Sequence, residues 1–95
     1  MIRIFRISGA SMEPDYHEGD FVIVRRSRMW QFKPGTPIAF LHPEYGMLIK
    51  KVDHSNAESQ EIWVTGTNPR SIKSQTLGPI SMKQVLGTVL ARFRN

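Results

Sequence analysis

The apolar residues of this chain fall into six short segments that are rich in β-branched and aromatic side chains. Segments of this length and composition are typical of strands that pack into a core. Residues that favour turns, mainly Gly, Pro, Asn and Asp, separate one segment from the next. The predicted strands are Ile2–Ile7, Phe21–Val24, Pro37–Leu41, Met47–Val52, Glu61–Thr65 and Val85–Phe93.

The predicted turns are Glu18-Gly19-Asp20, Lys33-Pro34-Gly35, His42-Pro43-Glu44-Tyr45-Gly46, Ser55-Asn56, Asn68-Pro69 and Gly78-Pro79. Proline is thus confined to turns and segment edges, as ladder hydrogen bonding requires. One brief helical turn is predicted at Ser81–Gln84, with Ser81 as its N-cap. We therefore expect an all-β fold, a partly closed, coiled sheet of about six or more strands, in a single domain over residues 1–95.

The composition excludes several classes of chemistry. There is no cysteine, so disulfides, thiolate metal sites and a cysteine nucleophile are all ruled out. The three histidines, His17, His42 and His54, lack a metal-binding spacing. The sequence also contains no stretch of about 20 apolar residues and no secretory signal pattern. We expect a soluble protein that needs neither a metal nor another cofactor.

The chain carries a formal net charge of +5, which raises the question of an anionic partner. Most of the charge is scattered, which argues against nucleic acid. The one dense cluster lies in Arg25–Phe32, where three arginines precede Trp30 and Phe32. This loop is a candidate for peripheral contact with anionic lipid. The alternative is a solvated basic loop whose Trp30 folds into the core.

The segment Gly9-Ala10-Ser11-Met12-Glu13-Pro14 follows directly on the first predicted strand. Ser11 would therefore lie where regular pairing ends, with its hydroxyl exposed. Gly9 and Ala10 offer little obstruction to a substrate carbonyl, and the backbone N–H groups of Ala10 and Ser11 are candidates for an oxyanion hole. A plain structural turn explains the same residues, so this motif alone does not settle the function.

A second signal lies in Leu48-Ile49-Lys50-Lys51-Val52, where two lysines stand inside an apolar strand. Because successive side chains of a strand point to opposite faces, one of the two must face inward. Burial disfavours the charged ammonium, and a neutral amine can accept a proton from a serine hydroxyl. The alternative for Lys50 is a lysine that extends to solvent from a sheet edge, or that pairs with Asp53 or Glu44.

In their order and spacing these motifs resemble the Ser–Lys peptidases, which include type I signal peptidases, LexA-type self-cleaving repressors and short peptidases proposed to mature nickel superoxide dismutase. The resemblance covers nearly the whole chain. It runs through Gly9–Pro14, Gly19–Val24, Pro34–Phe40, Leu48–Val52, Val64–Ile80 and Val85–Val89.

The resemblance implies a serine endopeptidase with Ser11 as nucleophile and Lys50, the first basic residue of its motif, as general base. It also implies that Ser71 orients the Lys50 amine; a loop serine that caps a turn is the alternative. Substrate would bind as an added β-strand along Arg3–Ser8. Ile7, Ser8, Gly9 and Met12 would then contact substrate.

The C-terminal motif departs from the family pattern at Thr67, Lys73 and Gln75. This motivates an alternative from another class, a catalytically silent module that binds a peptide, nucleic acid or a membrane surface. Self-cleavage is a second alternative, although only ten residues precede Ser11. We expect a protein or peptide substrate as the main partner, keep a homodimer as a candidate, and expect a cytoplasmic location, with membrane association through a partner as the alternative.

Overall fold

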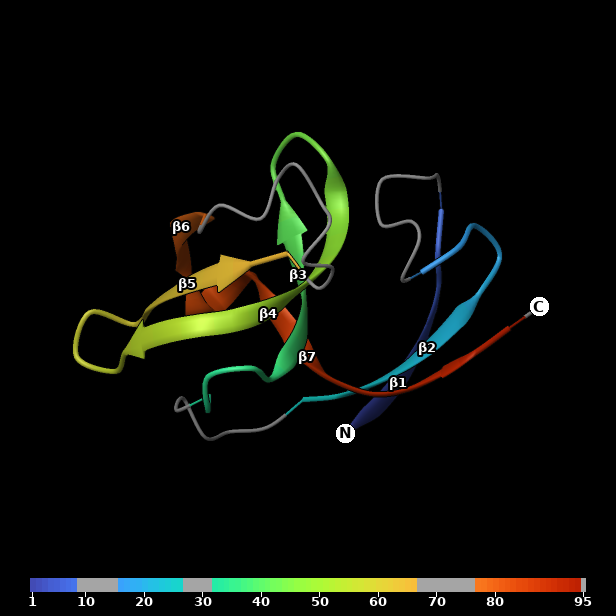
Figure 1. Ribbon diagram of the computed structural model, residues 1–95, viewed down its shortest axis with the longest axis horizontal. Coiled ribbons are helices and arrows are strands. Elements are labelled where there is room, and N and C mark those ends of the chain that lie inside the picture. Colours follow the sequence, from blue (N-terminus) through green and yellow to red (C-terminus); the bar gives the residue numbers. More distant parts are fainter. Residues whose placement is uncertain (9–15, 27–31, 67–76, 95) are drawn as a thin grey trace.

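A computed structural model of the chain describes residues 1–8, 16–26, 32–66 and 77–94. In order, the described elements are β1 (Ile2–Arg6), β2 (Phe21–Arg25), β3 (Pro37–His42), β4 (Gly46–Asn56), β5 (Glu61–Thr65), β6 (Leu77–Ser81), the 3₁₀ helix η1 (Met82–Gln84) and β7 (Val85–Phe93). The strands form one antiparallel sheet in the order β1-β2-β7-β3-β4-β5-β6, with β1 and β6 at its edges (Figure 1). The predicted all-β fold is confirmed, with one strand more than the six segments.

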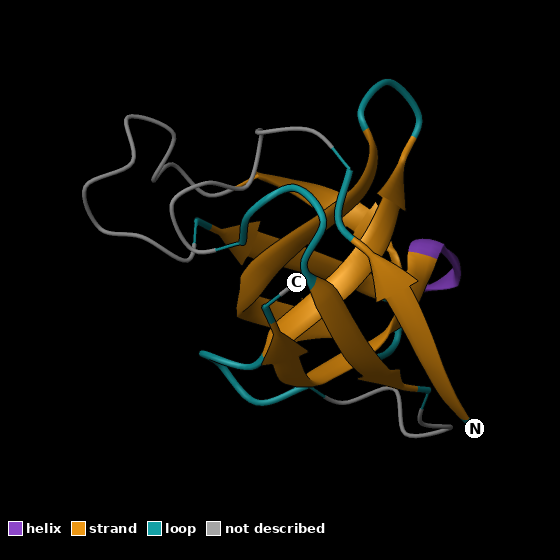
Figure 2. Cartoon of the chain, turned by 90° about the vertical axis from the view of Figure 1, so that its right-hand side faces the viewer, coloured by secondary structure: helices purple, strands orange, loops and turns teal. Residues whose placement is uncertain are grey.

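The sheet coils because its two longest strands each change partner along their length. Strand β4 pairs with β3 from Gly46 to Lys51 and with β5 from Lys51 to Asn56. Strand β7 likewise pairs with β3 up to Thr88 and with β2 from Thr88 to Phe93. The two ends of the sheet therefore diverge from β3 in Figure 1, and in the side view of Figure 2 the strands overlap rather than lie in one plane.

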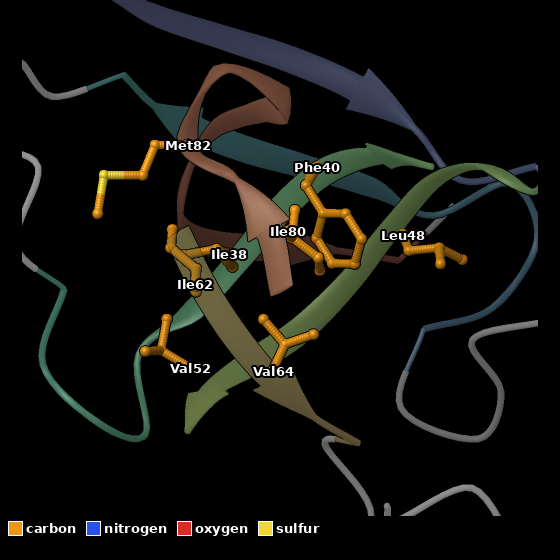
Figure 3. Packing of buried hydrophobic residues seen from close by; sticks show 8 residues of the cluster. All are labelled: Ile38, Phe40, Leu48, Val52, Ile62, Val64, Ile80 and Met82. Atoms are coloured by element: carbon orange, nitrogen blue, oxygen red, sulfur yellow. The ribbon is translucent and has the colours of Figure 1, made fainter. Parts of the chain in front are cut away.

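Coiling produces two hydrophobic cores, one against each face of β3 and β4. Ile38 and Phe40 of β3 point into the first core, whereas Ala39, between them, belongs to the second. The first core, shown in Figure 3, consists of Ile38, Phe40, Leu48, Val52, Ile62, Val64, Ile80 and Met82. The second consists of Ile7, Val22, Val24, Ala39, Ile49 and Val89.

Two predicted turns are wrong. Gly78-Pro79 lies inside β6, which pairs with β5 as an edge strand and so tolerates a residue without an N–H. Ser55-Asn56 belongs to β4, whose regular pairing extends to Asn56 before the turn at residues 57–60. The capping prediction is confirmed: Ser81 Oγ accepts a hydrogen bond from the Lys83 N–H at 3.2 Å, and Gln84 Oε1 accepts one from the Ser81 N–H at 3.0 Å.

Gly87 of β7 packs against the backbone of Arg25 in β2, and its φ is +151°. A Cβ there would overlap the Arg25 carbonyl oxygen and lie 2.7 Å from Val24 Cγ1. Gly87→Ala should therefore lower the free energy of unfolding by about 3 kcal/mol, because overpacking adds to backbone strain. Urea denaturation followed by circular dichroism measures this. Gly46→Asn is the control, since a Cβ at Gly46 meets nothing within 4 Å and Asn tolerates its φ of +73°; an equal loss in both variants would contradict the packing argument.

Candidate active site

The predicted site residues divide into two groups. Lys50, Ile7 and Ser8 lie in the part of the chain that the structure describes. The predicted nucleophile Ser11, its neighbours Gly9, Ala10 and Met12, and the predicted positioning residue Ser71 lie outside the described residues. The geometry of the site is therefore built from Lys50 and from the ends of the strands that lead into these segments.

The two lysines of β4 point to opposite faces, as the alternation predicts. Lys50 shares a face with Leu48 and Val52 and is half-buried, whereas Lys51 is exposed. Across the ladder Lys50 pairs with Ile38, which is fully buried in the same core. Three apolar residues of the first core thus lie next to Lys50 along and across the ladder. Lys51 shares the other face of β4 with Ile49 of the second core but is itself exposed.

Lys50 also lies at the point where β4 changes partner. Pairing with β5 begins at Lys51, which lies opposite Thr65. Among the described residues, no strand covers this side of β4 from Gly46 to Lys50. The chain leaves β5 through Gly66, next to this open edge, and then enters the segment that contains Ser71. The topology thus begins the Ser71 segment beside Lys50.

The strand that leads toward Ser11 is fixed by the turn at residues 17–20. The Ile7 N–H donates to the Asp20 carbonyl oxygen at 2.7 Å, and the Gly19 N–H donates to the Ile7 carbonyl oxygen at 2.9 Å. The Asp20 side chain, 4% exposed, accepts a hydrogen bond from the His17 N–H at 3.1 Å, and the Asp20 N–H donates to the His17 carbonyl oxygen. This closed turn holds Ile7 four residues before Ser11.

The second core joins the end of the first strand to the face of β4 that lies opposite the Lys50 side chain. Ile7, 1% exposed, and Ile49, which directly precedes Lys50, belong to the same buried cluster. The end of the first strand and the lysine strand, 42 residues apart in sequence, therefore share one core. Ser8, the next residue, is exposed. The serine segment thus starts from a fixed point close to β4.

The basic loop is described only at its ends. Arg25 and Arg26 are exposed, and Phe32 is half-buried against the first core, whereas Trp30 lies outside the described residues.

Asp53 Oδ2 lies 2.6 Å from His54 Nδ1, and the His54 ring stacks on Trp63. No group of three or more His, Asp or Glu residues in the described ranges is placed to hold a metal ion. No described helix is long and apolar enough to cross a membrane.

Sequence reasoning did not anticipate how Ile7 is held. Ile7 was expected to contact substrate, but its side chain is buried and its N–H and C=O groups bond to the 17–20 turn. The sequence did contain the signal: a glycine followed by an aspartate is suited to a tight turn with a side-chain acceptor. The sequence did not show which segment this turn would contact, because the contact with Ile7 is set by the pairing of β1 with β2.

A coiled antiparallel sheet with a half-buried lysine on one of its central strands is consistent with a serine peptidase-type fold. The family model described as Peptidase S24-like matches residues 2–90. The chain belongs to this family, and the match includes the positions of Ser11, Lys50 and Ser71. No curated protein matches the sequence.

The Asp20 turn provides a test of how the serine segment is anchored. Asp20→Ala removes a buried acceptor, leaves the His17 N–H without its side-chain partner, and should cost about 1–3 kcal/mol of stability. We expect the Ile7 and Gly19 amides to exchange hydrogen faster than in the unaltered protein, beyond the general loss. Amide exchange followed by NMR measures this. Asp53→Ala is the control, because its carboxylate is exposed; unchanged protection of Ile7 in Asp20→Ala would show that the turn does not hold it.

Proposed function

We propose that this protein is a serine endopeptidase that carries out limited proteolysis of a protein substrate with a Ser11–Lys50 dyad. The observation that carries the proposal is the contrast between the two lysines. Lys50 is half-buried next to apolar residues of the first core, at the point where pairing with β5 begins, and Lys51 is exposed. Membership of the Peptidase S24-like family supports the class of enzyme.

In the proposed reaction, Ser11 Oγ attacks the scissile carbonyl carbon while the neutral Lys50 amine takes the hydroxyl proton. Backbone N–H groups of Ala10 and Ser11 stabilise the oxyanion of the tetrahedral intermediate. Lys50 then gives its proton to the leaving amine, and an ester to Ser11 remains. Water attacks this ester, Lys50 takes the water proton and returns it to Ser11 Oγ. In this proposal Ser71 is a positioning residue that accepts or donates a hydrogen bond at the Lys50 amine.

The edge of β1 suits the binding of substrate as an added strand. The Arg26 N–H donates to the Met1 carbonyl oxygen and the Ile7 N–H to the Asp20 carbonyl oxygen, so the odd-numbered residues of β1 bond to β2. In an antiparallel ladder the alternate residues then direct their N–H and C=O groups away from β2. Ile2, Ile4 and Arg6 therefore offer unpaired backbone groups to an extended peptide that runs toward Ser8.

The substrate itself is proposed only as a class, a protein or preprotein with an extended cleavage segment. Ile7 contributes to its binding by anchoring the strand end, and Ser8, Gly9 and Met12 form the contact surface next to Ser11. A maturation role in the cytoplasm follows from the resemblance to the short maturation peptidases. A catalytically silent peptide-binding module on the same sheet would retain binding at β1 but show no turnover.

Replacement of either dyad residue should abolish turnover without unfolding the protein. Ser11→Ala and Lys50→Met should each lower kcat/KM by at least about 10³-fold, because nucleophile and base act as a unit. Lys51→Met is the matched control, since it removes the same group from the exposed neighbour and should retain activity within a few fold. The measurement is mass spectrometry of products from a peptide library. Full activity of both dyad variants, or equal loss in Lys51→Met, would contradict the assignment.

Strand addition predicts an unusual tolerance for proline at Ile4. Ile4→Pro removes an N–H that faces away from β2, so the fold should persist, as judged by circular dichroism. Cleavage of a soluble peptide in the absence of lipid should fall at least about tenfold, mainly through KM, because one inter-strand hydrogen bond and the edge geometry are lost. Ile4→Val is the control and should behave like the unaltered protein. Undiminished cleavage by a folded Ile4→Pro variant would exclude docking at this edge.

A further inference from the structure

The outer face of the β1-β2-β7 part of the sheet is apolar and exposed. On the inner face, Phe5 of β1, Ile7 directly after it, Val22 and Val24 of β2 and Val89 of β7 pack in or against the second core. The alternate side chains therefore point outward. The register aligns them in three rows across the strands: Ile2, Arg25 and Thr88; Ile4, Ile23 and Ala91; and Arg6, Phe21 and Phe93.

Most of the exposed large apolar side chains of the described chain lie on this face. Ile2 is 64% exposed, Ile4 66%, Phe93 54% and Phe21 37%. Leu90, at the register shift between β2 and β7, is 51% exposed and lies beside the middle row. Single exposed apolar residues are ordinary, but a contiguous group across three strands marks a contact surface. In Figure 1 these strands extend together toward the C-terminus, away from β5 and β6.

The charge around this face is strongly positive. All six arginines of the described residues lie in its strands or directly beside them, namely Arg3, Arg6, Arg25, Arg26, Arg92 and Arg94. Among the described residues, the acids next to these strands are Glu18 and Asp20, and Asp20 is buried. The rest of the described chain holds four lysines and four acids, so its charge is balanced. Arg6 and Arg25 stand in the outer rows, and Arg26 and Arg94 directly follow β2 and β7, whereas Arg3 and Arg92 lie over Phe5 and Tyr16 on the side of the second core. The outer face therefore carries guanidinium groups at its ends, and guanidinium groups bind phosphate in a bidentate manner.

The combination of exposed apolar side chains and arginines on this face favours one kind of binding partner over the others. A second copy stacked on this face or paired along β1 would bring two arginine-rich surfaces together, and like charges in contact are repelled. Nucleic acid would satisfy the arginines but would leave Ile4, Leu90 and Phe93 against sugar and phosphate. The surface of an anionic bilayer offers both complements in one plane, phosphate groups above and acyl chains below.

We propose that the outer face of β1, β2 and β7 docks on an anionic lipid surface. Ile4, Leu90 and Phe93 enter the boundary between headgroups and acyl chains, and Arg6 and Arg25 bind lipid phosphate. The unpaired N–H and C=O groups along the β1 edge exclude deeper entry, because hydrocarbon leaves them without partners. The contact is therefore shallow and reversible, and of the segment Arg25–Phe32 considered from the sequence it uses only Arg25.

Flotation of the full chain with vesicles tests this proposal, independently of proteolysis. The protein should float with phosphatidylcholine vesicles that contain about 30% phosphatidylglycerol and not with pure phosphatidylcholine, because each arginine near an anionic surface contributes about 1 kcal/mol. Leu90→Asp and Phe93→Asp should each lower the partition coefficient at least about tenfold, since each replaces an apolar side chain that is buried in the bilayer when the protein is bound. Arg6→Gln combined with Arg25→Gln should lower it by a similar factor.

Matched controls lie on the opposite part of the sheet. Leu41→Asp and Tyr45→Asp change residues that are 50% and 66% exposed, with the same change in charge, and should float normally. Lys33→Gln combined with Lys83→Gln lowers the net charge as much as the arginine pair does and should have little effect. The proposal is overturned if the unaltered protein does not float, or if controls and face variants lose binding equally. A dimer in sedimentation that Leu90→Asp dissociates, without flotation, would assign the face to a second copy instead.

Discussion

The structure depends on the burial of the middle of β3 from both sides. Ile38, Ala39 and Phe40 are each fully buried, and their side chains alternate between the two cores. A strand of this kind needs apolar cover on each face, and a flat sheet supplies none. The chain supplies the cover with its own sheet, because β4 and β7 run past β3 and carry β5-β6 over one face and β1-β2 over the other. Two cores from one coiled sheet are the result.

Much of this architecture could be predicted from the sequence, because strands and turns are local. The six apolar segments all proved to be strands, and the N-cap at Ser81 and the turn after His42 were correct. The seventh strand, β6, was missed because Gly78 and Pro79 usually interrupt a strand, and only an edge position beside β5 accommodates them. A coiled sheet was predicted, but the strand pairings that produce the coiling were not, since the partner change of β4 and β7 is set by contacts between distant segments.

For the candidate site, alternation along β4 established that one lysine must face inward, but not which one. The choice of Lys50 rested on family resemblance; in the structure Lys50 lies on the face of the first core and is half-buried, whereas Lys51, on the face of the second core, is exposed. The sequence predicted a turn at Gly19-Asp20, but it did not show that this turn forms hydrogen bonds with Ile7. The roles of Ser11 and Ser71 stay predictions, because both residues lie outside the described part of the chain.

The turn between β3 and β4 has a consequence for how the chain tolerates changes in length. It spans residues 43–45, and the pairing of His42 with Gly46 sets every later match, including Ile38 with Lys50. Side chains of a strand alternate with a period of two, so a one-residue slip moves each of them to the other face. A single insertion or deletion in this hairpin that is carried into β4 would move Lys51 to the face of the first core and Val52 to the opposite face. The length of the hairpin therefore determines which of the two lysines lies on which face of β4.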